Sequence, residues 1–198
     1  AWKWSYPESE WDANEASRKW KNVERWIGHH SPTNGNRIIE GEWRNEGPNN
    51  IGGRFNFIRQ HPTEPSKLFA GSSTGGLWVT TGDGEWMCLT ETLPAMSNGD
   101  LVFHEEDANQ LFLASGDPQI SSFPRIGAGV FHSVNGGASW SSAGLDSMGI
   151  ISKLLQTTDN PPALLAGTMG NPAIPGPQRG LFKSTNDGLD WEQVLLPN

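Results

Sequence analysis

The sequence Ser133-Val-Asn-Gly-Gly-Ala-Ser-Trp140 returns 51 residues later as Ser184-Thr-Asn-Asp-Gly-Leu-Asp-Trp191. Both copies hold Ser, Asn, Gly and Trp at the same relative positions, and Thr80 to Trp86 is a copy one residue shorter, with Gly82 at the Asn position. A Ser hydroxyl and an Asn side chain can bond nearby backbone groups, and Gly accepts a positive φ. Each copy is therefore predicted to be a tight turn with its Trp packed beneath it.

The segments before each turn repeat as well, so that the whole repeat is about fifty residues long. Trp86, Trp140 and Trp191 are 54 and 51 positions apart, and short apolar segments precede each of them. The first strand of each repeat is predicted over 54–59, 100–104 and 150–156, and the fourth strand begins at the Trp. Four short strands in about fifty residues make one propeller blade. The sequence predicts an all-β propeller with blades at about 43–92, 93–143 and 144–198.

The first 36 residues differ in composition and form a separate predicted segment. They hold five of the ten Trp, and Ser5 with Glu8 has the spacing of a helix capping box. Ala13, Ala16, Trp20, Val23 and Ile27 recur at three- and four-residue intervals before Gly28, a typical helix stop. We expect one N-terminal α-helix whose apolar stripe docks on a partner surface, followed by a linker at 30–36.

Charge and cysteine content exclude several classes of function. The chain has 14 basic and 22 acidic residues and a net charge of -8, and it lacks the Lys/Arg runs that neutralise nucleic acid phosphates. Its single cysteine, Cys88, rules out an intrachain disulfide. The sequence has no apolar stretch of the roughly 20 residues that span a bilayer. Its five histidines do not have metal-ligand spacing, so we expect neither a metal nor a cofactor.

The repeated turns resemble Asp boxes, also called BNR repeats, with Asn where Asp is usual. This motif is typical of a propeller superfamily that includes sialidases, xyloglucan-active glycosidases and sortilin-type receptor domains. In these turns the structural residues are Ser133, Asn135, Gly137 and Trp140, and in the second copy Ser184, Asn186, Gly188 and Trp191. The resemblance implies that these residues stabilise the blades and take no part in catalysis.

A closer resemblance covers nearly the whole chain. Trp43-Arg-Asn-Glu-Gly-Pro48, Gly52-Gly-Arg54, Gly75-Gly-Leu-Trp78 and Ala114-Ser-Gly-Asp117 are similar to the opening of large bacterial sortilin-like (VPS10-type) propeller proteins. Members of that group are commonly exported by type IX secretion. The resemblance implies a protein that is secreted or held on the outer surface of a Gram-negative bacterium.

Candidate ligand-binding residues lie in the loops of one propeller face. The loops that join strands two and three, at 72–75, 116–129 and 169–180, share that face in a propeller, and loops on a rigid scaffold commonly bind ligands. With Arg54 at the start of a first strand, these loops supply the candidate residues, which are Arg54, Asp117, Gln119, Phe123, Arg125 and Arg179. They suit a polar ligand. The alternative is that Pro and Gly only extend the loops and Asp117 only forms a turn before Pro118.

Two enzymatic hypotheses follow from the superfamily. Sialidases need a Tyr nucleophile, whereas Tyr6, the single Tyr, precedes the blades. Xyloglucan-active members carry a catalytic Asp within Thr-Asp-x-Gly-Gly, and here the segment is Ser72-Ser73-Thr74-Gly75-Gly76. A Ser cannot replace a carboxylate as general acid or base. No catalytic residue is predicted in this chain.

The leading prediction is non-catalytic recognition of a protein, peptide or glycan by a surface propeller. One alternative is a carbohydrate-active hydrolase whose carboxylates lie in further blades, and another is a component of an outer-membrane secretion or adhesion assembly. Because closed propellers have four or more blades, we expect further blades of a longer protein, or else another copy or chain, to complete the arc.

Overall fold

The computed structural model describes residues 53–119, 124–174 and 176–195. The chain divides into two units, residues 1–47 and 48–198, and all of the described residues belong to the second. The predicted N-terminal helix and its docking surface lie outside the described residues. Those described contain no helix long and apolar enough to cross a membrane.

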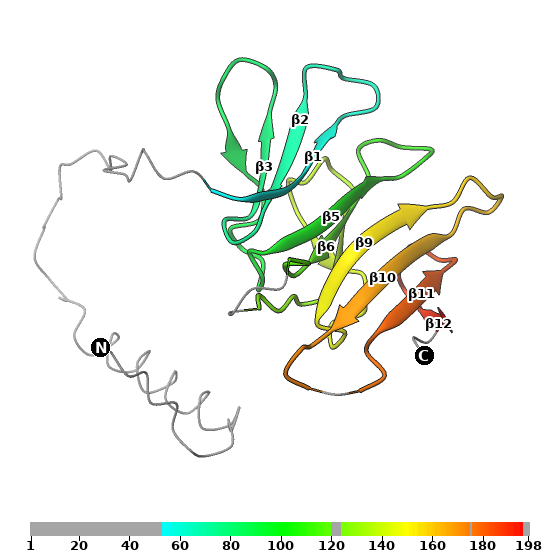
Figure 1. The fold of residues 1–198 in the computed structure, drawn as a ribbon. Helices are drawn as coiled ribbons and strands as arrows, with labels where there is room; N and C mark the ends of the chain where they lie inside the picture. The colour runs from blue at the N-terminus through cyan, green and yellow to red at the C-terminus, as the bar shows by residue number, and fades with distance from the viewer. Residues whose placement is uncertain (1–52, 120–123, 175, 196–198) are drawn as a thin grey trace, which may run out of the picture. The chain divides into compact units, whose positions relative to one another are not determined.

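The described residues form three separate four-stranded antiparallel sheets, each with its strands in sequence order (Figure 1). Sheet 1 consists of β1 (Phe55–Gln60), β2 (Leu68–Ser72), β3 (Leu77–Thr80) and β4 (Met87–Cys88). Sheet 2 consists of β5 (Asn98–Phe103), β6 (Leu111–Ser115), β7 (Val130–Ser133) and β8 (Ser141–Ser142). Sheet 3 consists of β9 (Ile150–Gln156), β10 (Leu164–Gly170), β11 (Gly180–Ser184) and β12 (Glu192–Leu195). The predicted all-β class and the four-stranded blades are confirmed.

Two hydrophobic cores join the three sheets face to face. Between sheets 1 and 2 the core is built around Phe57, Phe69, Leu101 and Phe131. Between sheets 2 and 3 it is built around Phe112, Ile151, Leu164 and Phe182. Sheet 2 is thus covered on both faces, which explains why every residue of β6 is buried.

The first strands of the sheets lie next to one another, as blades do around a propeller axis (Figure 1). β5 approaches β9 so closely that a Cβ on Gly99 would lie 1.9 Å from the carbonyl oxygen of Ile151. Only glycine can occupy this position without moving a strand.

The two repeated turns have the same internal hydrogen bonds. Ser133 Oγ accepts from Gly137 N (2.9 Å) and donates to Asn135 Oδ1 (2.9 Å), while Asn135 Oδ1 also accepts from Ser139 N (2.9 Å). The turn that begins at Ser184 repeats these bonds with Gly188, Asn186 and Asp190. Gly137 and Gly188 have φ of 92° and 84°, a conformation that glycine adopts without strain.

Each of these turns also joins its sheet to the preceding one. Trp140 Nε1 donates to the carbonyl oxygen of Leu89 (3.0 Å), and Trp191 Nε1 donates to that of Ala143 (2.8 Å). The repeated Trp therefore stabilises the junction between blades as well as its own turn.

Candidate functional site

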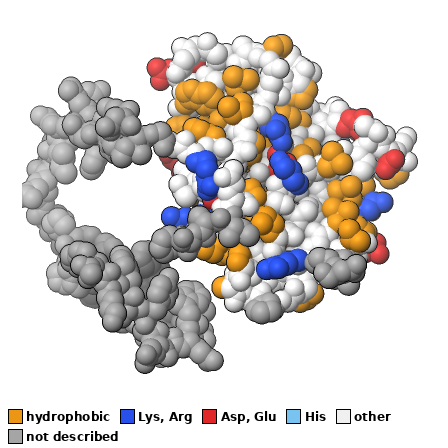
Figure 2. Space-filling model, viewed as in Figure 1, with side chains coloured by type: hydrophobic (Ala, Val, Ile, Leu, Met, Phe, Trp, Pro, Cys, Tyr) orange, Lys and Arg blue, Asp and Glu red, His pale blue; other side chains and the backbone are white. Residues whose placement is uncertain are grey.

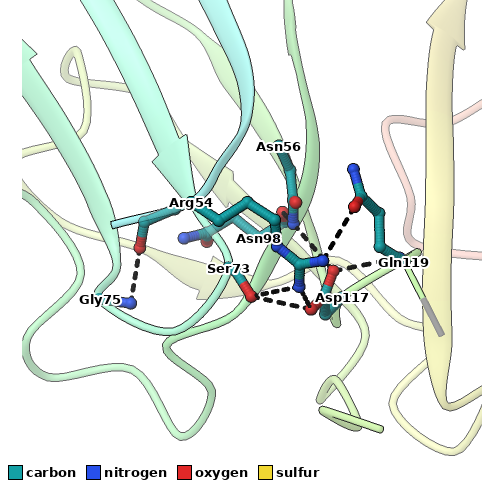
Figure 3. Close-up of polar contacts among 8 residues, drawn as sticks. Arg54, Asn56, Ser73, Gly75, Asn98, Asp117 and Gln119 are labelled. Atoms are coloured by element: carbon teal, nitrogen blue, oxygen red, sulfur yellow. Dashed lines mark hydrogen bonds and ion pairs between the residues drawn. The ribbon is translucent and has the colours of Figure 1, made fainter. Parts of the chain in front are cut away.

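Polar residues from sheets 1 and 2 meet at the edge where β1 and β5 begin and β2 and β6 end. Arg54 precedes β1, Ser73 follows β2, Asn98 opens β5 and Asp117 lies just after β6. Together with Asn56 and Gln119 they form the Arg54–Asp117 cluster (Figure 3). The cluster lies on the side of the two sheets that carries the loops predicted to bind a ligand.

An ion pair between Arg54 and Asp117 forms the centre of the cluster. Arg54 Nη2 donates to Asp117 Oδ2 and to Ser73 Oγ (2.7 Å), and Nη1 donates to Gln119 Oε1 (2.8 Å). The Asp117 side chain is 2% exposed, whereas that of Arg54 is 40% exposed. The buried carboxylate therefore holds a guanidinium whose outer surface remains accessible to solvent.

The remaining acceptor positions of Asp117 are filled from the same cluster. Ser73 Oγ donates to Oδ2 (2.8 Å), while Gln119 N (3.1 Å) and Asn56 Nδ2 (3.3 Å) donate to Oδ1. The Gln119 contact is the Asx turn that the sequence indicated before Pro118. Asp117 thus forms a turn and also joins two sheets.

A β-bulge turns Asn56 toward this network. The pairing of β1 with β2 shifts register between Phe55 and Phe57, and bulged residues commonly point away from the regular ladder. Asn56 Nδ2 donates to the backbone carbonyl oxygen of Asn98 (2.9 Å), which links β1 to β5.

Two buried oxygen atoms of the cluster have no donor among the described residues. They are Oδ1 of Asn56 and Oδ1 of Asn98, and the Asn98 side chain belongs to a residue that is 0% exposed. Because an unpaired buried acceptor costs about 1 to 3 kcal/mol, buried groups of this kind are commonly paired with an internal water molecule.

The structure brings together three of the six candidate residues, Arg54, Asp117 and Gln119. Arg125 is exposed on the same loop, and its carbonyl oxygen accepts from Asp117 N (2.9 Å). Arg179 belongs to the β10–β11 loop of sheet 3 and is not part of the Arg54–Asp117 cluster. Phe123 lies outside the described residues.

Asn56, Ser73 and Asn98 contribute to the cluster but were not among the candidates. Ser73 stands where the xyloglucan-active pattern has its catalytic Asp, and its hydroxyl bonds both Arg54 and Asp117. Asp117 is the one carboxylate of the cluster, and its oxygens are engaged by protein donors. The described part of the chain therefore lacks an accessible pair of carboxylates at this edge.

A second charged group joins the first strands of all three sheets. Asp100 on β5, with a 2% exposed side chain, pairs with Arg59 Nη2 on β1 (2.5 Å) and with Lys153 Nζ on β9 (3.3 Å). It also accepts from Leu154 N (3.4 Å). Asp100 and Asp117 are the buried carboxylates of the described residues, and each is paired with a cation.

The described histidines serve packing. The ring of His132 stacks on Phe112, with centroids 4.4 Å apart, and burial lowers the pKa of His132 below its ordinary value. Burial of the neutral ring thus disfavours the imidazolium. Among the described residues there is no group of three or more His, Cys, Asp or Glu side chains that could hold a metal ion.

Comparison with known proteins relates the fold to glycoside hydrolases. No protein-family model matches the chain, and no curated protein matches it. Among solved structures, an ancestral GH74 enzyme is 26% identical with a TM-score of 0.55, over 73% of this chain and 19% of that enzyme. The GH74 enzyme of Niastella koreensis is 19% identical with a TM-score of 0.50, over 70% of this chain and 21% of the enzyme.

A GH74 xyloglucanase from Xanthomonas campestris matches at 16% identity and a TM-score of 0.38, over 72% of this chain and 30% of that enzyme. The chain spans about a fifth of the length of the first two structures. The three sheets are propeller blades similar in fold to part of the ancestral GH74 enzyme and of the Niastella koreensis enzyme.

Proposed function

We propose that this chain is a carbohydrate-recognising part of a propeller and that its own residues do not cleave the bound glycan. The single observation that carries the proposal is the Arg54–Asp117 cluster, which combines an accessible guanidinium with an accessible side-chain amide and lacks an accessible carboxylate pair among the described residues.

The chemistry of the cluster favours a ligand rich in hydroxyl groups. Arg54, whose side chain is 40% exposed, offers guanidinium donors, and the exposed side-chain amide of Gln119 offers both a donor and an acceptor. Sugar hydroxyls both donate and accept, so one ligand can satisfy both kinds of group. The likeness to GH74 enzymes favours a glycan over the peptide or protein ligands that the sequence left open.

The proposal that this edge does not cleave the glycan rests on how Asp117 is held. A glycosidase needs one carboxyl group to protonate the leaving oxygen and a second to act as base or nucleophile. Asp117 is 2% exposed and its oxygens are occupied by Arg54, Ser73, Asn56 and the Gln119 amide. It therefore supports the positions of its neighbours and does not reach a glycosidic oxygen.

Calorimetric titration tests this proposal, with xyloglucan oligosaccharides as the first ligands and cello-oligosaccharides as the second. We expect binding without release of reducing ends. Gln119→Ala should weaken binding about fivefold to tenfold, as expected for one lost hydrogen bond. Gln60→Ala, an exposed Gln at the far end of β1, is the matched control and should leave affinity unchanged. Equal affinities of the two variants would refute the site.

The second candidate function is hydrolysis by a longer protein of which these blades are a part. The observation that favours it is the 26% identity to a GH74 enzyme of which the chain covers 19%. This hypothesis requires catalytic carboxylates outside the described residues. Release of oligosaccharides from xyloglucan by the intact protein from its native source, but not by residues 1–198, would support it.

A surface location accompanies the recognition hypothesis. It rests on the resemblance of the repeated turns to Asp boxes and of the chain to sortilin-like proteins exported by type IX secretion. Antibodies against the chain should label intact cells of the source organism, and labelling that requires permeabilised cells would contradict this location.

A further inference from the structure

The first strands of the three sheets carry one charged residue each, and the three residues form a single group. β1 has Arg59, β5 has Asp100 and β9 has Lys153. Arg59 Nη2 (2.5 Å) and Lys153 Nζ (3.3 Å) contact different oxygens of the same Asp100 carboxylate. Two cations therefore share one carboxylate, which leaves one positive charge in excess.

Solvent reaches the cations of this group but not its carboxylate. The side chains of Lys153 and Arg59 are 69% and 38% exposed, whereas that of Asp100 is 2% exposed. The same asymmetry holds just before β1, where Arg54 at 40% exposure pairs with Asp117 at 2%. A molecule that approaches the first strands from solvent therefore meets cations, and the carboxylates lie behind them.

These cations reach toward sheet 2, between the described blades, and not toward the outer faces of sheets 1 and 3. Arg54 and Arg59 extend from sheet 1 to carboxylates of sheet 2, and Lys153 extends from sheet 3 to one of the same carboxylates. First strands line the central channel of a propeller, so further blades beside sheet 1 or sheet 3 would leave these contacts unchanged. Figure 2 shows Lys and Arg side chains along the middle of the face on which the first strands lie.

Acidic residues gather at the opposite end of the first strands, although the chain as a whole has a net charge of -8. The turns that follow β1, β5 and β9 carry Glu64, Glu105, Glu106, Asp107 and Asp159. An anion is therefore repelled where the first strands end, and it is attracted to their middle and to the edge where they begin. That edge holds the Arg54–Asp117 cluster.

We propose that the first strands bind a glycan that carries carboxylate groups, such as an oligomer of uronic acids. This ligand class rests on the proposed function, because hydroxyl groups of the same glycan bind at the Arg54–Asp117 cluster while its carboxylates pair with Arg59 and Lys153. Arginine and lysine side chains both form charge-assisted hydrogen bonds with carboxylates. A neutral glycan would leave the excess positive charge of the group without a partner.

Calorimetric titration of the 198-residue chain with oligogalacturonides and with their methyl esters tests the proposal. The two ligands share a sugar backbone and differ in charge, so their comparison isolates the carboxylates. We expect the acidic form to bind about tenfold more tightly than the ester, as two exposed ion pairs would allow. Added salt should weaken binding of the acidic form and leave that of the ester unchanged, because salt screens exposed charges.

Substitution of Lys153 separates a role in binding from a role in stability. Lys153→Gln should weaken binding of the acidic form about threefold to fivefold, the value of one exposed ion pair, and leave binding of the ester unchanged. Lys153→Arg keeps the charge and should retain the wild-type affinity. Lys183→Gln removes the same charge from β11, away from the first strands, and is the matched control that should bind both forms like the wild type. Circular dichroism shows whether each variant is folded.

The outcomes distinguish this proposal from the proposed function. Equal affinities for the acid and its ester would overturn the carboxylate ligand and leave glycan recognition standing, whereas no binding of any glycan would remove both. Equal effects of Lys153→Gln and Lys183→Gln would show that the first strands are not the site. Dextran sulfate that binds as tightly as the oligogalacturonides would reveal attraction to any polyanion and would also overturn the proposal. A loss in Lys153→Gln without one in Gln119→Ala would support the carboxylate contact and refute the Arg54–Asp117 cluster as the site for hydroxyl groups.

Discussion

Lys153 Nζ on β9 lies 3.3 Å from Asp100 Oδ2 on β5, and this pair joins two blades beside the propeller axis. The partners differ sharply in exposure, at 69% for the Lys153 side chain and 2% for that of Asp100. In Figure 2, Lys and Arg side chains lie along the middle of the face that shows the first strands. The two ends of this ion pair should therefore contribute unequally to stability.

Asp100→Ala should lower the free energy of unfolding by about 2 to 4 kcal/mol, because it leaves buried backbone amides without an acceptor. Lys153→Ala should cost less than about 1 kcal/mol, since an exposed lysine remains hydrated when its partner is lost. Urea denaturation of both variants measures the difference. Equal losses would contradict a structural role for the buried carboxylate.

The serine that opens each repeated turn provides a second test. Ser133 is 1% exposed and its hydroxyl bonds Gly137 N and both the backbone and side chain of Asn135. Ser133→Ala and Ser184→Ala should each lower the free energy of unfolding by about 1 to 3 kcal/mol. Ser141→Ala, at an exposed serine with one 3.3 Å bond, is the control and should cost less than about 0.5 kcal/mol. If the control matches either variant, the turn network does not stabilise the blade.

Two glycines of almost equal φ allow the stability cost of backbone strain to be distinguished from the cost of steric overlap. Gly129 and Gly84 have φ of 93° and 92°, yet a Cβ on Gly129 would lie 2.5 Å from the Gly144 carbonyl oxygen, whereas none of the described atoms lies within 4 Å of one on Gly84. Both alanine variants incur the strain of a left-handed backbone, about 1 to 2 kcal/mol. Gly129→Ala should cost about 1 to 3 kcal/mol more. Thermal unfolding in matched buffers compares the stabilities of the two alanine variants. Equal losses of stability would show that the chain relaxes around position 129.

The blades could be predicted because the features that identify each one lie close together in the sequence. Turn residues and apolar segments lie within one stretch of about fifty residues, so the positions of the strands follow from the pattern alone. The predicted first strand at 150–156 coincides with β9, and the one at 54–59 differs from β1 by one residue at each end. The fold class therefore required no knowledge of contacts between blades.

The Arg54–Asp117 cluster was only partly predictable because its contacts cross the blades. Arg54 and Asp117 are 63 positions apart, and their ion pair depends on how sheet 1 packs against sheet 2. Asn56 enters the cluster through a β-bulge, which leaves no signature in the strand pattern. Loop position identified Asp117 and Gln119, while Asn56 and Asn98 required the register of the strands.

Protonation of His132 should make the blades less stable in mild acid. Burial lowers the pKa of His132, the nearby His104 lowers it further, and Asp187 acts in the opposite direction. Because the folded pKa is the lower one, the unfolded chain takes up the proton first as the pH falls. The His132 contribution to stability is therefore present above the unfolded value of about 6.5 and declines below it, down to the folded pKa.

Urea denaturation at a series of pH values between neutrality and mild acid measures this dependence as the slope of the free energy of unfolding against pH. His132→Gln should flatten the slope in that window, even though the loss of the Phe112 stack lowers stability at every pH. Asp187→Asn removes the one charge that favours the imidazolium, so it should steepen the slope; asparagine tolerates the positive φ of position 187. A wild-type slope that neither substitution changes would mean that another group governs the acid sensitivity, because the two variants act on the same equilibrium in opposite directions.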